Sequence, residues 1–378
     1  MTETLQFHNP NRAEKAHITL AETYAEVHTT NAKGKTRTRK VKGYDFADKA
    51  VVELLRKGFL VSDGSQLLVH SEVGPPMGLA FAVDEERGVA WLGDWGALRR
   101  VDLTSGEMET WDTGHFRGIR EVKVDDEGSP WFLADRDDDP PSDSNYRVPS
   151  PGRCVVAVLR LLAGKVEVWR EIVVDDKVRT TAFILNLSRD RLLVPWPGGY
   201  QLLSRQDGAP QKSAELPSMK HWCPKAALSP QGTFLANTAG PNELQLTNLE
   251  TGTVQNLSGE FEDVMKLCVD DSGLVTLGAG TPNWSFQQLS TEPSENCTLP
   301  LGATDYAFLK GRISSSSGTR GFLHDLSGHQ LAEFPVCGGL KSTRVEMTEK
   351  AVYARTMLGV FQRWPLNHGN SNSVGRNG

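Results

Sequence analysis

The sequence GVAWLGDWGALRRVDLTSGEMETW, Gly88–Trp111, contains the local pattern that decides the fold. Short apolar or alternating runs are separated here by segments rich in Gly, Asp and Ser, which is typical of β-strands joined by tight turns. The runs are Val89–Leu92, Leu98–Leu103 and Met108–Trp111, and the turns are Gly93–Gly96 and Thr104–Gly106. So small a sheet cannot bury both of its faces, and it needs copies of itself as neighbours.

Two turns recur along the chain and identify the copies: one that precedes the run Val89–Leu92, and Thr104–Gly106, which follows the run Leu98–Leu103. The first recurs at 84–88, 125–128, 188–190, 229–232 and 270–273, and the second at 104–106, 163–165, 206–208, 250–252 and 326–328. Gly88 and Gly128 are 40 residues apart, and Gly232 and Gly273 are 41 apart, which is the repeat length of a β-propeller blade. The sequence therefore predicts a mainly β fold, a seven-bladed β-propeller with six or eight blades as alternatives.

The repeat also predicts where the propeller begins and how it closes. The expected blades are 78–112, 119–174, 181–216, 224–258, 263–300, 304–335 and 341–366. Gln66–His70 alternates like a strand but precedes the first blade, so we expect it to complete the last blade and remove the open sheet edges. We divide the chain into a small basic α+β domain at 1–62, the propeller at 63–366 and a disordered tail at 367–378.

The period and the two turns resemble those of the WD-repeat superfamily over roughly 300 residues. The Gly-His and Trp-Asp dipeptides of that family are missing from this sequence. The resemblance therefore implies the propeller fold and not the hydrogen-bonded side-chain tetrads of WD repeats.

Composition limits the possible classes of protein. The 378 residues include 38% apolar and 23% charged residues, an ordinary globular profile. No apolar run is long enough for a signal peptide or a membrane helix, so we expect a cytoplasmic protein without membrane contact. The five cysteines lack Cys-x-x-Cys spacing, so we expect reduced thiols and no metal site. No dinucleotide, phosphate-loop or nucleophile-elbow motif occurs, and no cofactor is expected.

Charge is distributed unevenly between the N-terminal segment and the rest of the chain. Residues 1–60 carry eleven Lys and Arg against seven Asp and Glu, whereas the rest carries 30 against 40. Six of these eleven cations lie close together in the sequence: Lys33, Lys35, Arg37, Arg39, Lys40 and Lys42. If this segment is the second strand of a hairpin that starts near Tyr24, the first four cations should project from one face. Asp45–Phe59 has the apolar spacing of an amphipathic helix, so we expect a hairpin followed by a helix.

The basic strand, the helix and the end Lys57-Gly58-Phe59 resemble the second half of a WGR domain. The Trp-Gly-Arg signature is replaced here by Asn31-Ala32-Lys33-Gly34-Lys35. The resemblance implies a small α+β module with a possible role in nucleic-acid binding. The six cations are accordingly predicted to bind nucleic acid or an acidic partner, and the alternative is a solvated edge strand whose lysines prevent aggregation.

Four tryptophans fall near the ends of the second strands of blades, where loops reach one face of a propeller. They are Trp95, Trp131, Trp196 and Trp284. Exposed aromatic side chains there would form a protein-binding surface. The alternative for each of them is packing between neighbouring blades.

Two functions fit these observations. The favoured one is a non-enzymatic scaffold that binds a protein partner through the loop face of the propeller. The other is a metal-dependent hydrolase of the propeller-lactonase kind, with its site in the central channel. That site needs Asp, Glu, Asn or His on several inner strands, and the inner strands expected at 78–83, 122–124, 226–228 and 266–269 are nearly free of them.

Overall fold

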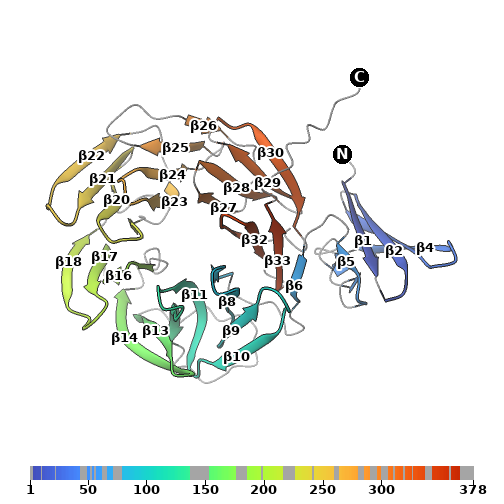
Figure 1. Ribbon diagram of the computed structural model, residues 1–378, viewed down its shortest axis with the longest axis horizontal. Coiled ribbons are helices and arrows are strands. Elements are labelled where there is room, and N and C mark those ends of the chain that lie inside the picture. Colours follow the sequence, from blue (N-terminus) through green and yellow to red (C-terminus); the bar gives the residue numbers. More distant parts are fainter. Residues whose placement is uncertain are drawn as a thin grey trace.

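The computed structural model shows an N-terminal sheet with one helix beside a ring of four-stranded sheets (Figure 1). The predicted mainly β propeller fold is confirmed. The residues that the structure describes are 3–9, 11–21, 23–42, 49–51, 53–54, 57–61, 66–70, 79–136, 153–175, 185–196, 199–215, 226–240, 242–258, 264–279, 285–289, 296–298, 305–309, 311–317, 320–325, 327–336, 343–356 and 359–366. The predicted tail at 367–378 lies outside them.

The N-terminal sheet is antiparallel, with strand order β4-β3-β2-β1-β5. The strands are β1 (Glu3–Asn9), β2 (Glu14–Leu20), β3 (Tyr24–Thr30), β4 (Thr36–Lys42) and β5 (Leu60–Val61). The expected hairpin corresponds to β3 and β4, but the expectation is incomplete because β1 and β2 come before it. Both extra strands carry apolar residues at alternate positions, and their remaining positions are mostly charged residues, His, Thr, Gln or Asn, which gave this segment the composition of a loop.

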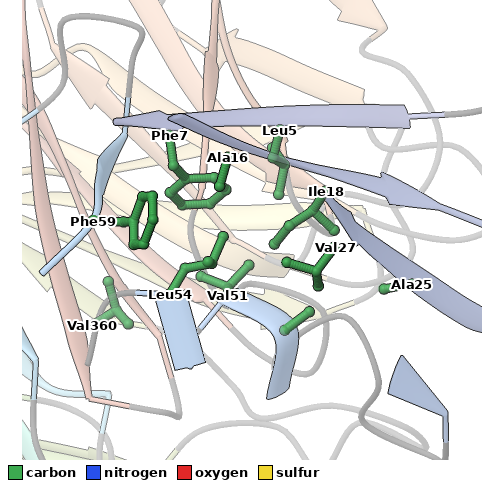
Figure 2. Packing of buried hydrophobic residues seen from close by; sticks show 11 residues of the cluster. Leu5, Phe7, Ala16, Ile18, Ala25, Val27, Val51, Leu54, Phe59 and Val360 are labelled. Carbon is green, nitrogen blue, oxygen red and sulfur yellow. The ribbon is translucent and has the colours of Figure 1, made fainter. Parts of the chain in front are cut away.

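One face of the N-terminal sheet is apolar and packs against the helix that includes 49–51 and 53–54. Figure 2 shows Phe7, Leu54 and Phe59 turned toward one another in this core. Val360, from strand β33 of the propeller, is fully buried in the same cluster. The N-terminal part and the propeller therefore share one hydrophobic core, which fixes their contact.

Seven four-stranded antiparallel sheets are formed by the described residues, and they are arranged in a ring (Figure 1). The first three contain β7 (Phe81–Asp84), β8 (Val89–Gly93), β9 (Ala97–Asp102) and β10 (Met108–Asp112); β11 (Phe116–Val124), β12 (Pro130–Arg136), β13 (Arg153–Leu162) and β14 (Lys165–Asp175); and β15 (Asn186–Leu187), β16 (Arg191–Trp196), β17 (Gly199–Ser204) and β18 (Pro210–Glu215). The next three contain β19 (Ala226–Leu228), β20 (Phe234–Gly240), β21 (Glu243–Asn248) and β22 (Val254–Ser258); β23 (Val264–Val269), β24 (Val275–Ala279), β25 (Ser285–Leu289) and β26 (Asn296–Thr298); and β27 (Asp305–Leu309), β28 (Arg312–Ser317), β29 (Arg320–Asp325) and β30 (Gln330–Pro335). The last contains β31 (Thr343–Met347), β32 (Ala351–Thr356), β33 (Val360–Pro365) and β6 (Gln66–His70).

The recurrent turns have a common physical cause. In the turn after β11, the Asp125 carboxylate accepts the backbone amides of Glu127 and Ser129, at 3.0 and 2.8 Å. Asp270 holds the turn after β23 in the same way, through the amides of Ser272 and Leu274. Such side-chain to backbone bonds stabilise a turn locally, which explains why Asp marks these positions in the sequence.

The ring closes where β6, from the start of the propeller, pairs with β33 from its end. Charged side chains join the last sheet to the first at this seam. Arg355 of β32, only 1% exposed, donates to the carbonyls of Ala80 and Gly93 and pairs with the Asp94 carboxylate. This closure arranges the inner strands of all the sheets around one central axis, and we call the region around this axis the channel.

Candidate functional site

The four tryptophans predicted to form a binding surface lie in different surroundings. Trp95 lies in the turn between β8 and β9 and is 46% exposed, and Trp196, at the end of β16, is half-buried. Trp131 is only 3% exposed, so the prediction that it belongs to a binding surface is wrong. Its indole N–H donates to Asp125 at 3.0 Å, which is why a polar aromatic residue fits the core there. Trp284 lies outside the described residues.

Trp95 rests on the backbone of the neighbouring blade. A Cβ atom added at Gly118 of β11 would lie 3.2 Å from the Trp95 ring, so a side chain there would push the ring away by a few tenths of an ångström. Gly118 also has a φ of +63°, in the left-handed region that favours glycine. The glycine therefore seats the indole, while much of the ring stays in solvent.

An ion pair lies beside this seat. The Arg120 guanidinium contacts the Asp135 carboxylate at 2.7 and 2.8 Å, and both side chains are partly exposed. That carboxylate would lie 3.4 Å from a Cβ atom at Gly118, next to the ring of Trp95. We call Trp95, Gly118, Arg120 and Asp135 the Trp95 surface. An exposed aromatic ring beside partly exposed charges has the composition of a binding hot spot with a polar rim.

The central channel contains charged side chains that sequence reasoning missed. Glu121 and Lys123 come from β11, Arg344 and Glu346 from β31, Lys266 from β23 and Asp305 from β27. The four inner-strand ranges expected from the sequence contain no carboxylate, but the inner strands as a whole are not free of them. The expected inner strands left out the first half of β11 and did not consider β27 or β31. Side chains from four blades meet here because the ring closes, and no spacing in the sequence signals that meeting.

Each of these carboxylates lies close to cations. Arg344 contacts both oxygens of Glu121, at 2.9 and 2.5 Å, and Lys123 lies 3.3 Å from the same carboxylate. Arg344 is also 3.6 Å from Glu346, and Lys266 is 3.7 Å from Asp305. Among the described residues, three acidic and three basic side chains therefore balance one another in this region.

The pKa values follow from this arrangement. Burial by itself raises the pKa of Glu121, but the charges of Arg344 and Lys123 outweigh burial and lower that pKa to about 2. Burial raises the pKa of Glu346, although Lys123 and Arg344 oppose the shift. Paired carboxylates hold a channel together, but they have few oxygen lone pairs left for a metal ion or a substrate.

Nothing in the described part of the chain adds a metal centre to these pairs. Among the described residues, no group of three or more His, Cys, Asp or Glu is placed to hold a metal ion. Cys268, the one cysteine whose side chain is described, is a free thiol in the channel strand β23, and burial raises its pKa. The interpretation as a metal-dependent hydrolase gains no support from these residues. Within the described residues, no helix is long and apolar enough to span a membrane.

The N-terminal cations do not form the expected single-faced row. Strand β4 begins at Thr36, so Lys33 and Lys35 lie in and beside the turn, where the Asn31 side chain accepts both of their backbone amides. Arg37 and Arg39 pair with Thr29 and Val27, and Val27 is buried on the helix side of the sheet. The side chains of Arg37 and Arg39 thus belong to that side.

Lys40 and Lys42 belong to the other side of the sheet, opposite Glu26 and Tyr24. Two of the cations in β4 already have acidic partners: Arg39 lies 2.6 Å from Glu53 of the helix, and Lys40 lies 3.1 Å from Glu26. The structure thus brings the cations to one edge of the sheet, with their side chains on both of its faces.

The comparisons with known proteins support the fold alone. No protein-family model matches the chain, and no curated protein matches its sequence. The β-propeller domain of Cps50 (Swd1) from Myceliophteria thermophila has a TM-score of 0.57 at 12% identity, over 80% of this chain and 100% of that one. A chain of the Mitotic Checkpoint Complex has a TM-score of 0.55 at 13% identity, over 80% of this chain and 91% of that one. The computationally designed protein Ika8 has a TM-score of 0.50 at 15% identity, over 80% of this chain and 100% of that one.

Proposed function

We propose that this protein is a non-enzymatic interaction scaffold. Its propeller binds a protein partner through the Trp95 surface, and the basic strand of its N-terminal sheet makes a second contact, with an acidic partner or nucleic acid. The observation that carries the proposal is the exposure of Trp95. Seven of the nine tryptophans lie in described parts of the chain, and among these Trp95 is the only exposed one.

Trp95 is both exposed to water and held on a rigid support, and each property favours binding. A large aromatic side chain gains free energy by leaving water, so an exposed ring fixed on a rigid support favours association with another surface. Here the support is a β-strand of the next blade, so the ring loses little further conformational entropy when it is bound. The neighbouring Arg120–Asp135 pair can orient the partner through hydrogen bonds.

The hydrolase alternative would need an unpaired set of carboxylates or histidines in the channel. The carboxylates described there are Glu121, Asp305 and Glu346, and each has a cation within 4 Å. Their geometry favours a structural role in joining blades across the channel. A scaffold therefore accounts for more of the described features than an enzyme does.

A comparison of captured proteins tests the proposal. Wild-type protein, Trp95→Ala and the control Met108→Ala are immobilised, and proteins from a nuclease-treated native lysate are quantified by mass spectrometry. Met108 is 44% exposed on the outer strand β10, so its loss removes a similar exposed side chain elsewhere. We expect Trp95→Ala to lose at least tenfold of the specific partner while Met108→Ala retains it. Equal capture by all three proteins would refute a role for the Trp95 surface.

A further inference from the structure

Strand β4 has an open edge. Within the described residues it pairs with β3 and has no strand on its other side, and in Figure 1 it lies at the end of the molecule farthest from the propeller. All seven of its residues except the half-buried Val41 are exposed. An open edge of this length can pair with another extended chain.

The hairpin turn determines which backbone groups point outward. The amide of Asn31 donates to the carbonyl of Lys35 at 3.1 Å, so these residues form a hydrogen-bonded pair. Bonded and non-bonded pairs alternate along an antiparallel ladder, so Arg37, Arg39 and Val41 direct their backbone groups toward β3. The N–H and C=O groups that face the open edge are those of Thr36, Thr38, Lys40 and Lys42.

The positive charge of this edge determines which kind of partner it can bind. Four of its cations, Lys33, Lys35, Arg37 and Lys42, have no side-chain hydrogen bond or ion pair with a described residue. A second copy of the edge would place cations opposite cations, which is destabilising. A nucleic-acid strand is a poorer match, because its row of phosphates would meet cations that alternate between the two faces of the sheet. Two of these cations, Arg39 and Lys40, already pair with Glu53 and Glu26.

We propose that β4 binds an acidic peptide in extended conformation, which pairs with its open edge as a sixth strand of the N-terminal sheet. This inference rests on the proposed function, and it names the partner of the basic strand as a peptide. The main chain of the peptide bonds to the four outward pairs of backbone groups. Its carboxylates lie on both faces, because Arg37 is on one face and Lys42 is on the other.

Val41 gives the peptide a second feature. Its side chain is half-buried and packs against the hydrophobic core under the sheet. A peptide residue directly opposite Val41 lies on the same face and can cover the exposed part of that side chain. The best ligand is therefore a run of about seven residues, acidic on both sides of one apolar residue, which spans roughly 23 Å when extended.

The test uses the full chain and a labelled, acetylated and amidated peptide, Glu-Val-Glu-Glu-Glu-Glu-Glu, whose valine lies opposite Val41 when the peptide pairs antiparallel with all of β4. Two derivatives carry N-methyl groups on its even-numbered or odd-numbered backbone nitrogens. Methylation leaves the charge unchanged but removes the donors on one edge of the peptide. We expect one derivative to lose at least tenfold in affinity and the other to bind like the parent. Equal binding of the two derivatives would show that the peptide does not pair with the edge of β4. The proposal that the basic strand binds an acidic partner would still stand.

Residue-resolved hydrogen exchange locates the bound peptide. We expect the amides of Thr36, Thr38, Lys40 and Lys42 to gain protection, while those of Arg37, Arg39 and Val41 are protected already. Arg37→Gln with Lys42→Gln should weaken binding about two- to thirtyfold, and the control Lys165→Gln, at an exposed site on β14, should not.

Two further results would overturn the proposal. One is an unchanged exchange pattern in the presence of saturating peptide. The other is binding of single-stranded oligothymidylate, but of no acidic peptide, which would identify nucleic acid as the ligand of the basic strand. Trp95→Ala should bind the peptide like wild type, so the proposal for the Trp95 surface and the proposal for β4 are tested independently.

Discussion

Replacement of Arg355 by Met tests how the ring is closed. The arginine is almost fully buried between the last sheet and the first, and it donates to the carbonyls of Ala80 and Gly93, at 2.5 and 2.8 Å. It also pairs with Asp94, which has a second partner in Arg99 at 2.7 Å. Met fills much of the space of the arginine but donates no hydrogen bond. The Gly93 carbonyl therefore loses this donor, whereas the Ala80 carbonyl keeps the backbone amide of Gly93 at 2.8 Å, and the buried Asp94 carboxylate keeps only one of its cations.

The expected loss is large. Each buried acceptor left without a partner costs about 1–3 kcal/mol, and removing one member of a buried ion pair costs about 3–5 kcal/mol. These contributions overlap, because Arg99 still neutralises Asp94 and water can reach part of the gap. We expect Arg355→Met to lower the free energy of unfolding by about 3–5 kcal/mol.

Urea unfolding followed by tryptophan fluorescence measures this loss. The matched control is Arg100→Met, because Arg100 forms an exposed pair with Glu109 at 3.7 Å and should contribute less than about 1 kcal/mol. If Arg355→Met and Arg100→Met were equally stable, the seam would not depend on this arginine and the reasoning would be refuted.

Three further predictions concern the closure, the channel and the Trp95 surface. Deletion of 1–72, which removes β6, should unfold the propeller, whereas deletion of 1–60 should leave it folded; equal melting temperatures would contradict the closure. Glu121 has a folded pKa of about 2, below the ordinary value of 4.5 for a glutamate, so it stabilises the fold above pH 4.5 and this contribution is lost as pH falls toward 2. Glu121→Gln should therefore cost about 3 kcal/mol at pH 7 and very little at pH 2, as measured by urea unfolding at both pH values. Gly118→Ala should lower stability by about 1–2 kcal/mol and weaken partner capture, because its Cβ would displace Trp95; unchanged capture would exclude the glycine as a seat for the ring.

The sequence indicated the strands of the propeller well because local chemistry marks them. Asp125 and Asp270 hold their turns by bonds within a few residues, so the turn and its sequence signal coincide. Strands β1 and β2 were missed for the opposite reason. The open face of the sheet is covered by polar residues, among them His17 of β2 and His28 of β3, whose rings stack at 4.3 Å. In the sequence, strands with such a polar face resemble a loop, and their buried face becomes evident only in the structure.

The candidate sites were less predictable than the fold. Burial of Trp131 depends on Asp125, six positions away, which receives its indole N–H across a turn. The pairing of Glu121 with Arg344 spans 223 residues and exists only because the ring closes. Exposure of Trp95 likewise depends on Gly118 in the next blade. The last two features arise from contacts between blades, which a single repeat cannot show.

Site-specific photocrosslinking tests the central claim most directly. A benzophenone amino acid replaces Trp95 in one protein and Met108 in another, and each protein is irradiated in native lysate after nuclease treatment. The account predicts one dominant covalent adduct with a protein partner from position 95, suppressed by an excess of wild-type protein, and no such adduct from position 108. The same adducts from both positions, or none from position 95, would contradict a protein-binding role for the Trp95 surface.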